Sequence, residues 1–127
     1  MIFVDTNVFM YAVGRDHPLK PEARTFFLEH VESGEPLVTS AEVLQELMHA
    51  YLPVDRLETL DAAFALARDR TKTIWDVEVE DVMLARDLVS AHPSLGARDL
   101  LHLACCVRRG VQRVKTFDRP LAAAFPG

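Results

Sequence analysis

The chain has 127 residues, 50% of them hydrophobic, which is enough to bury a core and excludes an intrinsically disordered protein. No apolar run approaches the roughly 20 residues of a membrane span, and no signal-peptide pattern precedes the first apolar segment, so we expect a cytoplasmic protein. The net charge of −5 does not itself indicate nucleic-acid binding, and the adjacent Cys105 and Cys106 lack the spacing of zinc ligands.

Strands and helices are expected to alternate along the chain. In order, the pattern predicts a strand at 2–4, helices at about 7–14 and 20–33, a strand at 37–39, and helices at about 41–51 and 55–68. A strand at 71–75, helices at about 77–91 and 97–109, a strand at 111–115 and a short helix after residue 118 follow. Strands separated by helices predict a parallel sheet covered on both faces. We therefore expect one α/β domain over residues 1–127, a three-layer α/β/α sandwich with four or five parallel strands.

Two helix boundaries depend on capping residues. Thr39-Ser40-Ala41-Glu42 fits the capping-box pattern, in which Glu42 supplies the acid. Pro53 is expected to stop that helix, because the residue before a proline disfavours the α region. Asp55 is expected to cap the helix that follows.

Four acidic residues stand where a strand should end or a helix should begin: Asp5, Glu46, Asp99 and Asp118. In a parallel α/β fold such positions gather at one edge of the sheet, where ligands bind. Two carboxylates about 4 Å apart repel by roughly 4 kcal/mol at an intermediate dielectric, so four of them require a cation. Carboxylate clusters suit Mg²⁺ or Mn²⁺, and such sites usually serve phosphoryl chemistry.

Each acid alone also has a simpler explanation. Asp5, Asp99 and Asp118 could cap helices or stabilise a helix dipole, and Glu46 could be a solvated helical residue. We prefer Glu46 to Glu42 as a ligand, because the capping box already gives Glu42 a structural role. Glu42 is kept as a supporting acid.

Small polar residues and bases surround these positions. Thr6 and Asn7 could orient Asp5 or a bound water, and Thr116 could bind a carboxylate, a water or a phosphate. His102 lies one helical turn after Asp99 and could contact a carboxylate or a phosphate, although such a histidine is more often part of the core. Residues 98–127 carry six bases and two acids, so they could hold phosphates or form a solvated helix face. The bases are Arg98, Arg108, Arg109, Arg113, Lys115 and Arg119.

Taken together, four segments resemble the PIN-domain ribonucleases, in particular the VapC-type toxins of prokaryotic toxin–antitoxin modules. These segments are Phe3-Val4-Asp5-Thr6-Asn7-Val8, Val38 to Leu47, Arg98-Asp99-Leu100-Leu101-His102-Leu103-Ala104 and Val114-Lys115-Thr116-Phe117-Asp118. They cover nearly the whole chain in the family's order. The resemblance implies that Asp5, Glu46, Asp99 and Asp118 coordinate one or two Mg²⁺ or Mn²⁺ ions, with Thr6 and Thr116 as supporting hydroxyls.

The resemblance further implies a metal-dependent endoribonuclease that hydrolyses RNA with a metal-activated water. Arg98, His102, Lys115 and Arg119 would contact the substrate. A VapB-like antitoxin and a homodimer are the expected partners, and the helical hairpin at about 41–68 is a candidate surface for either. Many relatives have a fifth short strand, for which little room follows the last predicted helix.

Other classes of function were weighed on the same residues. A PIN-like module that binds RNA or protein without catalysis would carry the same fold, but all four acids are present here. A signalling receiver domain would have single helices between its strands and a paired acid after the first strand, whereas Thr6 and Asn7 follow Asp5. A haloacid-type phosphatase would need an aspartate at position 7. The identity of the RNA target does not follow from the sequence.

Overall fold

The sheet and its covering helices appear in a computed structural model, which describes residues 1–126. The strands are β1 (Ile2–Val4), β2 (Leu37–Ser40), β3 (Thr73–Trp75) and β4 (Arg113–Lys115). The helices are α1 (Thr6–Val13), α2 (Lys20–Glu32), α3 (Ala41–Tyr51), α4 (Leu57–Arg70), α5 (Val79–Asp87), α6 (Ala97–Arg108) and α7 (Arg119–Ala123). This is the predicted order of elements, with boundaries shifted by a few residues. No helix within residues 1–126 is both long and apolar enough to cross a bilayer.

All four strands are parallel, in the order β3-β2-β1-β4. The central strand β1 pairs Phe3 with Val38 on one side and with Val114 on the other, and its residues are buried. Because the strands run in one direction, the chain leaves β1, β2 and β4 at the same edge of the sheet. Within residues 1–126 no fifth strand joins this sheet.

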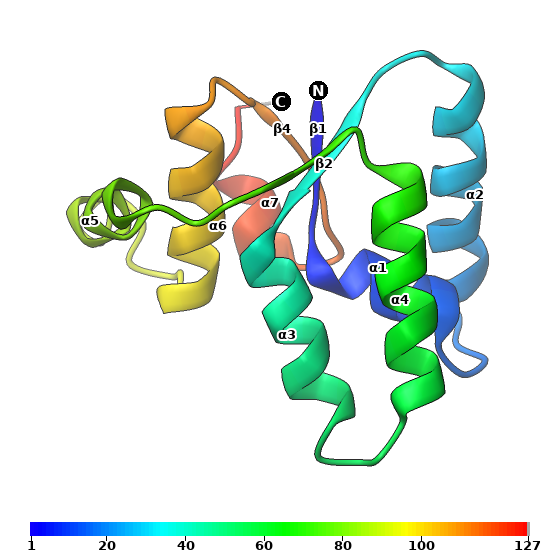
Figure 1. Cartoon of the computed structure of the whole chain (residues 1–127). Coiled ribbons are helices and arrows are strands. Elements are labelled where there is room, and N and C mark those ends of the chain that lie inside the picture. Colours follow the sequence, from blue (N-terminus) through cyan, green and yellow to red (C-terminus); the bar gives the residue numbers. More distant parts are fainter. Residues whose placement is uncertain (127) are drawn as a thin grey trace.

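Helices cover both faces of the sheet, which confirms the predicted three-layer sandwich. Figure 1 shows α5 and α6 on one side of the strands and α2 and α4 on the other. The core joins the strand side chains to Val8 and Phe9 of α1, Leu47 of α3 and Leu103 of α6. Both α3 and α6 therefore have one face fixed in the core, which positions the polar residues on their flanks.

The predicted capping box of α3 is wrong. Thr39 is a fully buried residue of β2, and its hydroxyl donates to the carbonyl oxygen of Val4 at 3.0 Å. The helix begins at Ala41 as predicted, but its N-cap is Ser40, whose hydroxyl accepts the Val43 N–H at 3.4 Å. Glu42 thus has no box to complete, which removes the structural role expected for it.

The predicted cap at Asp55 is also wrong. Its φ of 53° lies in the left-handed region, because the chain turns sharply after α3. The Arg56 N–H donates to the carbonyl of Tyr51 across this turn, and Arg56 becomes the N-terminal boundary of α4 without a side-chain cap.

Helix α5 is shorter than predicted and is fastened to α6 by a buried ion pair. A capping box opens it, in which the Asp81 carboxylate accepts the Glu78 N–H at 2.8 Å. Asp81 is fully buried and also accepts hydrogen bonds from Arg108 and Arg109, each at 2.8 Å. These arginines hold the pKa of Asp81 well below its usual range against the opposing effect of burial. Arg109 also lies over the ring of Trp75, which ties β3 to the same cluster.

We expect Asp81→Asn to reduce the free energy of unfolding by about 2–4 kcal/mol, because it leaves two arginines without their shared carboxylate. Urea unfolding monitored by circular dichroism would measure the loss. Glu80→Gln removes an exposed charge from the same helix and should change stability by less than about 0.5 kcal/mol. Equal stability of the two variants would show that the buried pair does not hold α5 in place.

Candidate active site

Asp5 is the acid that follows the central strand, and it is buried with only 5% of its surface exposed. One carboxylate oxygen, Oδ1, accepts the Thr6 N–H at 2.8 Å at the start of α1. The other oxygen, Oδ2, accepts the hydroxyl of Thr116 at 2.7 Å. Asp5 therefore caps a helix, as one explanation predicted, and still presents a buried carboxylate at the sheet edge.

Thr116 links the end of β4 to this carboxylate. While its hydroxyl donates to Asp5, the same oxygen accepts the Asp118 N–H at 3.0 Å and the Asn7 side-chain amide at 3.4 Å. Asn7 also accepts the Phe117 N–H at 3.2 Å through its own carbonyl. Thr116 and Asn7 thus hold the loop after β4 against the start of α1 and orient Asp5, as the sequence led us to expect.

Glu46 reaches Asp5 from α3. Its Oε2 accepts the hydroxyl of Thr6 at 3.0 Å, so Thr6 touches both acids, one through its backbone and one through its side chain. Glu42, one turn earlier on α3, makes no side-chain hydrogen bond to this cluster within residues 1–126. The structure therefore brings Glu46 and not Glu42 to the site.

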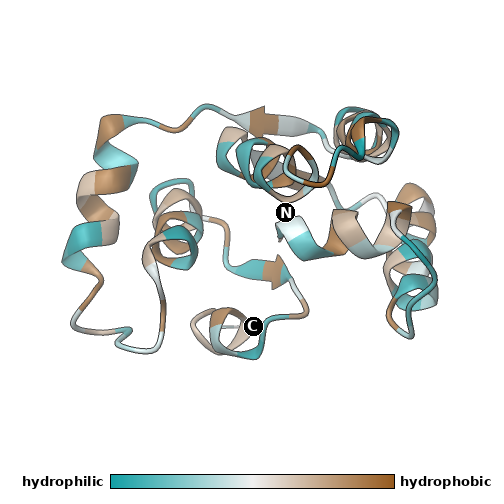
Figure 2. Cartoon of the chain, turned by 90° about the horizontal axis from the view of Figure 1, so that it is seen from below, coloured by the Kyte–Doolittle hydropathy of each residue, from teal (hydrophilic) through white to brown (hydrophobic). Residues whose placement is uncertain are grey.

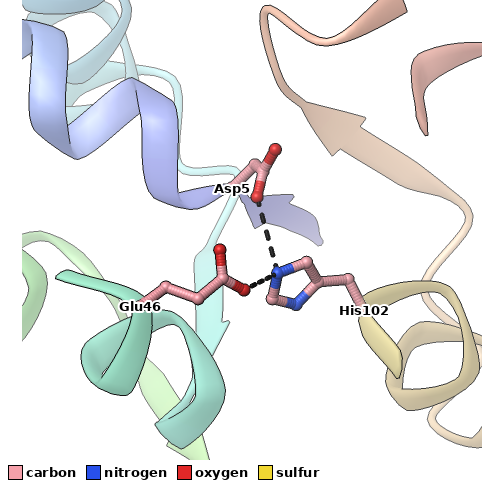
Figure 3. Close-up of side chains that lie close together, drawn as sticks. All are labelled: Asp5, Glu46 and His102. Atoms are coloured by element: carbon pink, nitrogen blue, oxygen red, sulfur yellow. Dashed lines mark ion pairs between the residues drawn. The ribbon is translucent and has the colours of Figure 1, made fainter. Parts of the chain in front are cut away.

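His102 is fully buried, as expected of a core histidine, and it also lies against both carboxylates. Its Nε2 is 2.5 Å from Oε1 of Glu46 and 3.7 Å from Oδ1 of Asp5 (Figure 3). The Glu46 contact is not aligned as a hydrogen bond, and Glu46 Oε1 and both ring nitrogens are buried without a hydrogen-bonding partner in the described chain. The position one turn after Asp99 and the apolar helix predicted both burial and a possible carboxylate contact, but not that Glu46 and Asp5 would be the partners.

Asp99 and Asp118 lie near Asp5. Asp99, half-buried in the first turn of α6, is within electrostatic range of Asp5 and Asp118. Asp118 caps α7 by accepting the Leu121 N–H at 3.4 Å. These two acids neighbour the tight group of Asp5, Glu46 and His102 but are not part of it.

The pKa shifts of these groups indicate that several negative charges lie close together. Burial raises the pKa of Asp5, and burial together with repulsion from Asp5 and Asp118 raises the pKa of Asp99 to about 6. Burial would lower the pKa of His102, but the contact with Glu46 and the neighbouring carboxylates raise it instead. Burial opposes ionisation of Glu46, yet its contacts with His102 and Thr6 outweigh that effect and lower its pKa.

These donors fit a divalent cation. One atom from each of Asp5, Glu46 and His102 lies within 4.8 Å of the others, and Glu46 Oε1 is buried without a hydrogen-bonding partner among residues 1–126. A buried polar atom left unpaired costs roughly 1–3 kcal/mol, which coordination would recover. Asp99 and Asp118 would add oxygen donors of the kind that Mg²⁺ and Mn²⁺ accept.

Most bases of the C-terminal third are occupied by ion pairs. Arg108 and Arg109 bind Asp81, and Arg113 binds Glu35. Lys115 lies 3.6 Å from Glu22 and above the ring of Phe117. Arg98 and Arg119, by contrast, are exposed and form no ion pair within residues 1–126. The expected phosphate-binding surface therefore narrows to these two arginines beside Asp99 and Asp118.

We expect Asp99→Asn to stabilise the metal-free protein at pH 8 but not below about pH 3.5. The folded-state pKa of Asp99, about 6, lies above its ordinary value of 3.8, so the folded chain retains a proton that the unfolded chain releases. The stability that Asp99 contributes to the wild type is therefore lost as pH rises through 6. The variant does not lose it, because asparagine does not ionise. In chelator, the melting temperature should rise by roughly 2–5 °C at pH 8. Asp87→Asn, at an exposed position, is the control, and an equal rise in both variants would contradict this account.

Comparison with known proteins agrees with this geometry. The PIN domain family profile matches residues 2–124. The chain is 64% identical over 125 residues to Ribonuclease VapC23 of Mycobacterium tuberculosis, covering 98% of each chain. It is 39% identical to Ribonuclease VapC13 of the same organism, covering all of this chain and 96% of that one.

Solved structures show the same fold at low identity. The crystal structure of Mycobacterium tuberculosis VapC20, described as a toxin that cleaves the sarcin–ricin loop, matches with a TM-score of 0.80 at 21% identity, covering 98% of this chain and 95% of that one. VapBC2 from Rickettsia felis, bound to a promoter DNA fragment, matches with a TM-score of 0.73 at 19% identity over 99% and 94% of the two chains. The sheet, the converging acids and the close relatives lead to one conclusion: the chain belongs to the PIN-domain family and is a ribonuclease of the VapC type.

Proposed function

We propose that this chain is the toxin of a VapBC-type toxin–antitoxin pair and that it hydrolyses RNA with one or two Mg²⁺ or Mn²⁺ ions held by Asp5, Glu46, Asp99 and Asp118. The observation that carries the metal assignment is the convergence of the buried Asp5 and the partly buried Glu46, Asp99 and Asp118 at the sheet edge, where burial and mutual repulsion raise the pKa of Asp99 to about 6. Carboxylates that repel one another in this way are relieved when a cation binds between them. The repulsion therefore favours a metal site over a site that works with the acids alone.

The chain's own residues would position the reaction. When bound, the divalent ion supplies a water of lowered pKa and neutralises charge on the phosphate and on the leaving oxygen. Thr6 and Thr116 hold the carboxylates of Glu46 and Asp5 in fixed orientations through hydrogen bonds of 3.0 and 2.7 Å. Cys105 is no candidate for a nucleophile, because burial raises its pKa to about 11. The proposed attacking group is a water bound to the ion and not a side chain of the protein.

RNA would approach along the exposed side of the acids. Arg98 and Arg119 lie at the rim of the site. Burial and the nearer contacts with His102 and Thr6 have the larger effects on the pKa of Glu46, and Arg98 is close enough to lower that pKa further. A hollow of about 560 Å³ begins at Asn7 and is lined by Tyr11, Arg15, Tyr51 and Arg56 among others. It is large enough for a nucleotide, with aromatic and cationic groups suited to a base and a phosphate. The sarcin–ricin loop cleaved by VapC20 supports structured RNA as the substrate class.

Two apolar surfaces support protein partners. The hairpin of α3 and α4 exposes Met48, Leu52, Val54 and Leu57, which suits the antitoxin or a second copy, as expected from the sequence. Helix α5 stands at the margin of the molecule with hydrophobic residues along its turns (Figure 2), where Val79, Val82 and Met83 are more than half exposed. This second face favours a homodimer.

Cellular RNA as substrate would place the protein in the cytoplasm.

The cleavage test uses purified protein and total cellular RNA, with Mn²⁺, with Mg²⁺ or with chelator. We expect cuts only with metal and a loss of at least about a hundredfold in rate for Asp5→Asn, because the change removes a ligand charge at nearly constant volume. Glu42→Gln, on the same helix as Glu46 but outside the cluster, should cleave as the wild type does. Undiminished cleavage in chelator, or by Asp5→Asn, would overturn the metal-dependent mechanism.

We expect Arg98→Ala to weaken RNA binding by about three- to tenfold and to reduce the slope of log affinity against log salt by about one, because one phosphate contact is lost. Filter binding of RNA across a salt series measures both quantities. Arg113→Ala is the matched control, since Arg113 pairs with Glu35 away from the acids. An equal effect of the two variants would show that net charge alone governs binding.

A further inference from the structure

His102 is a buried polar side chain in the acidic cluster, and the proposed metal site of four acids gives it no role. Its side chain is 0% exposed, so it cannot contact the RNA directly. Neither ring nitrogen has a hydrogen-bonding partner within residues 1–126. The ring is held by packing, with its centroid 5.3 Å from that of Phe3 in the central strand.

The orientation of the ring points to a ligand between the two carboxylates. Figure 3 shows Nε2 directed at the gap between Asp5 and Glu46, where it is 3.7 Å from Oδ1 of the first and 2.5 Å from Oε1 of the second. Two atoms that each lie about 2.1 Å from one ion can be at most about 4.2 Å apart. Both distances from Nε2 satisfy this limit, and one atom from each of the three residues lies within 4.8 Å of the others, so the group is compact enough to close around a single ion.

We propose that His102 Nε2 is a direct ligand of the ion held by Asp5 and Glu46, and that this nitrogen makes the site select Mn²⁺ over Mg²⁺. The inference rests on the proposed metal-dependent function and adds a fifth ligand to its four acids. Mg²⁺ prefers oxygen donors and dehydrates reluctantly, whereas Mn²⁺, a first-row transition metal of similar charge, accepts an imidazole nitrogen more readily. One nitrogen among carboxylates therefore shifts preference towards Mn²⁺ without excluding Mg²⁺.

The competing assignment gives His102 an indirect role, as a hydrogen-bond donor that orients Glu46. Residues that support metal ligands commonly act in this way. The geometry disfavours it, because the 2.5 Å contact between Nε2 and Glu46 is not aligned as a hydrogen bond. Nε2 contacts both carboxylates as an ion pair without an aligned hydrogen bond to either, which places it where an ion shared by the two carboxylates would sit.

Pulsed electron paramagnetic resonance of bound Mn²⁺ separates the two roles. We expect the full-length wild-type chain to show ¹⁴N modulation from one directly bound imidazole, which changes on ¹⁵N-histidine labelling. His102→Gln should retain Mn²⁺ binding without this modulation, and the ratio of Mn²⁺ to Mg²⁺ affinity, measured by calorimetry, should fall by roughly tenfold. His49→Gln, an exposed histidine on α3, should keep both properties.

The outcomes are distinguishable from those of the nuclease proposal. Mn²⁺ that binds the wild type and is lost in Asp5→Asn, yet shows no ¹⁴N modulation, overturns the role of His102 and leaves the four-acid site standing. Failure of the wild type to bind either ion overturns both proposals. The wild-type spectrum decides the question even where His102→Gln unfolds, which a thermal melt would reveal.

Discussion

The parallel pairing of β1 with β2 and β4 is the constraint on which the site depends. It places the end of β1, which carries Asp5, beside the end of β4, which carries Thr116. It also starts α3 directly after β2, so that Glu46 is delivered one and a half turns later to the same edge. A shift of one residue in either register would turn the β1 side chains to the opposite faces and would separate Thr116 from Asp5.

The stability that holds this edge together comes from elsewhere in the molecule. Buried carboxylates that repel one another destabilise a fold, and here the pKa values of Asp5 and Asp99 are raised accordingly. The opposite arrangement holds on α5 and α6, where Asp81 is buried between two arginines and its pKa is lowered. Helix α6 takes part in both arrangements. Asp99 in its first turn is repelled by the neighbouring acids, and Arg108 in its last turn is paired with Asp81. The anchored end keeps Asp99 and His102 in place despite the repulsion.

The element order and the converging acids could be predicted from the sequence because both follow from local patterns. Buried strands, turn residues and strand-end acids are each visible within a few residues, and parallel topology then brings Asp5, Glu46 and Thr116 together. What failed depended on contacts distant in sequence. Thr39 looked like a cap until its hydroxyl bonded the Val4 carbonyl across the sheet, and Asp55 looked like a cap until the turn after α3 took it into the left-handed region. The ion pairs of the basic residues were likewise not visible in the sequence, since their partners Asp81, Glu35 and Glu22 lie far along the chain.

The occupied bases explain how an acidic protein can act on RNA without a broad positive surface. Four of the six C-terminal bases neutralise acids of the fold, which leaves Arg98 and Arg119 as the cations at the rim of the site. Attraction of the phosphate backbone at long range is then weak, because the net charge is −5 and two exposed arginines are screened over about 8–10 Å. In the proposed function, substrate recognition would depend on short-range contacts at the acids, the rim arginines and the neighbouring hollow. Such contacts favour a defined RNA shape over indiscriminate binding, since a folded loop can satisfy all of them at once while an unstructured strand must lose conformational entropy to do so.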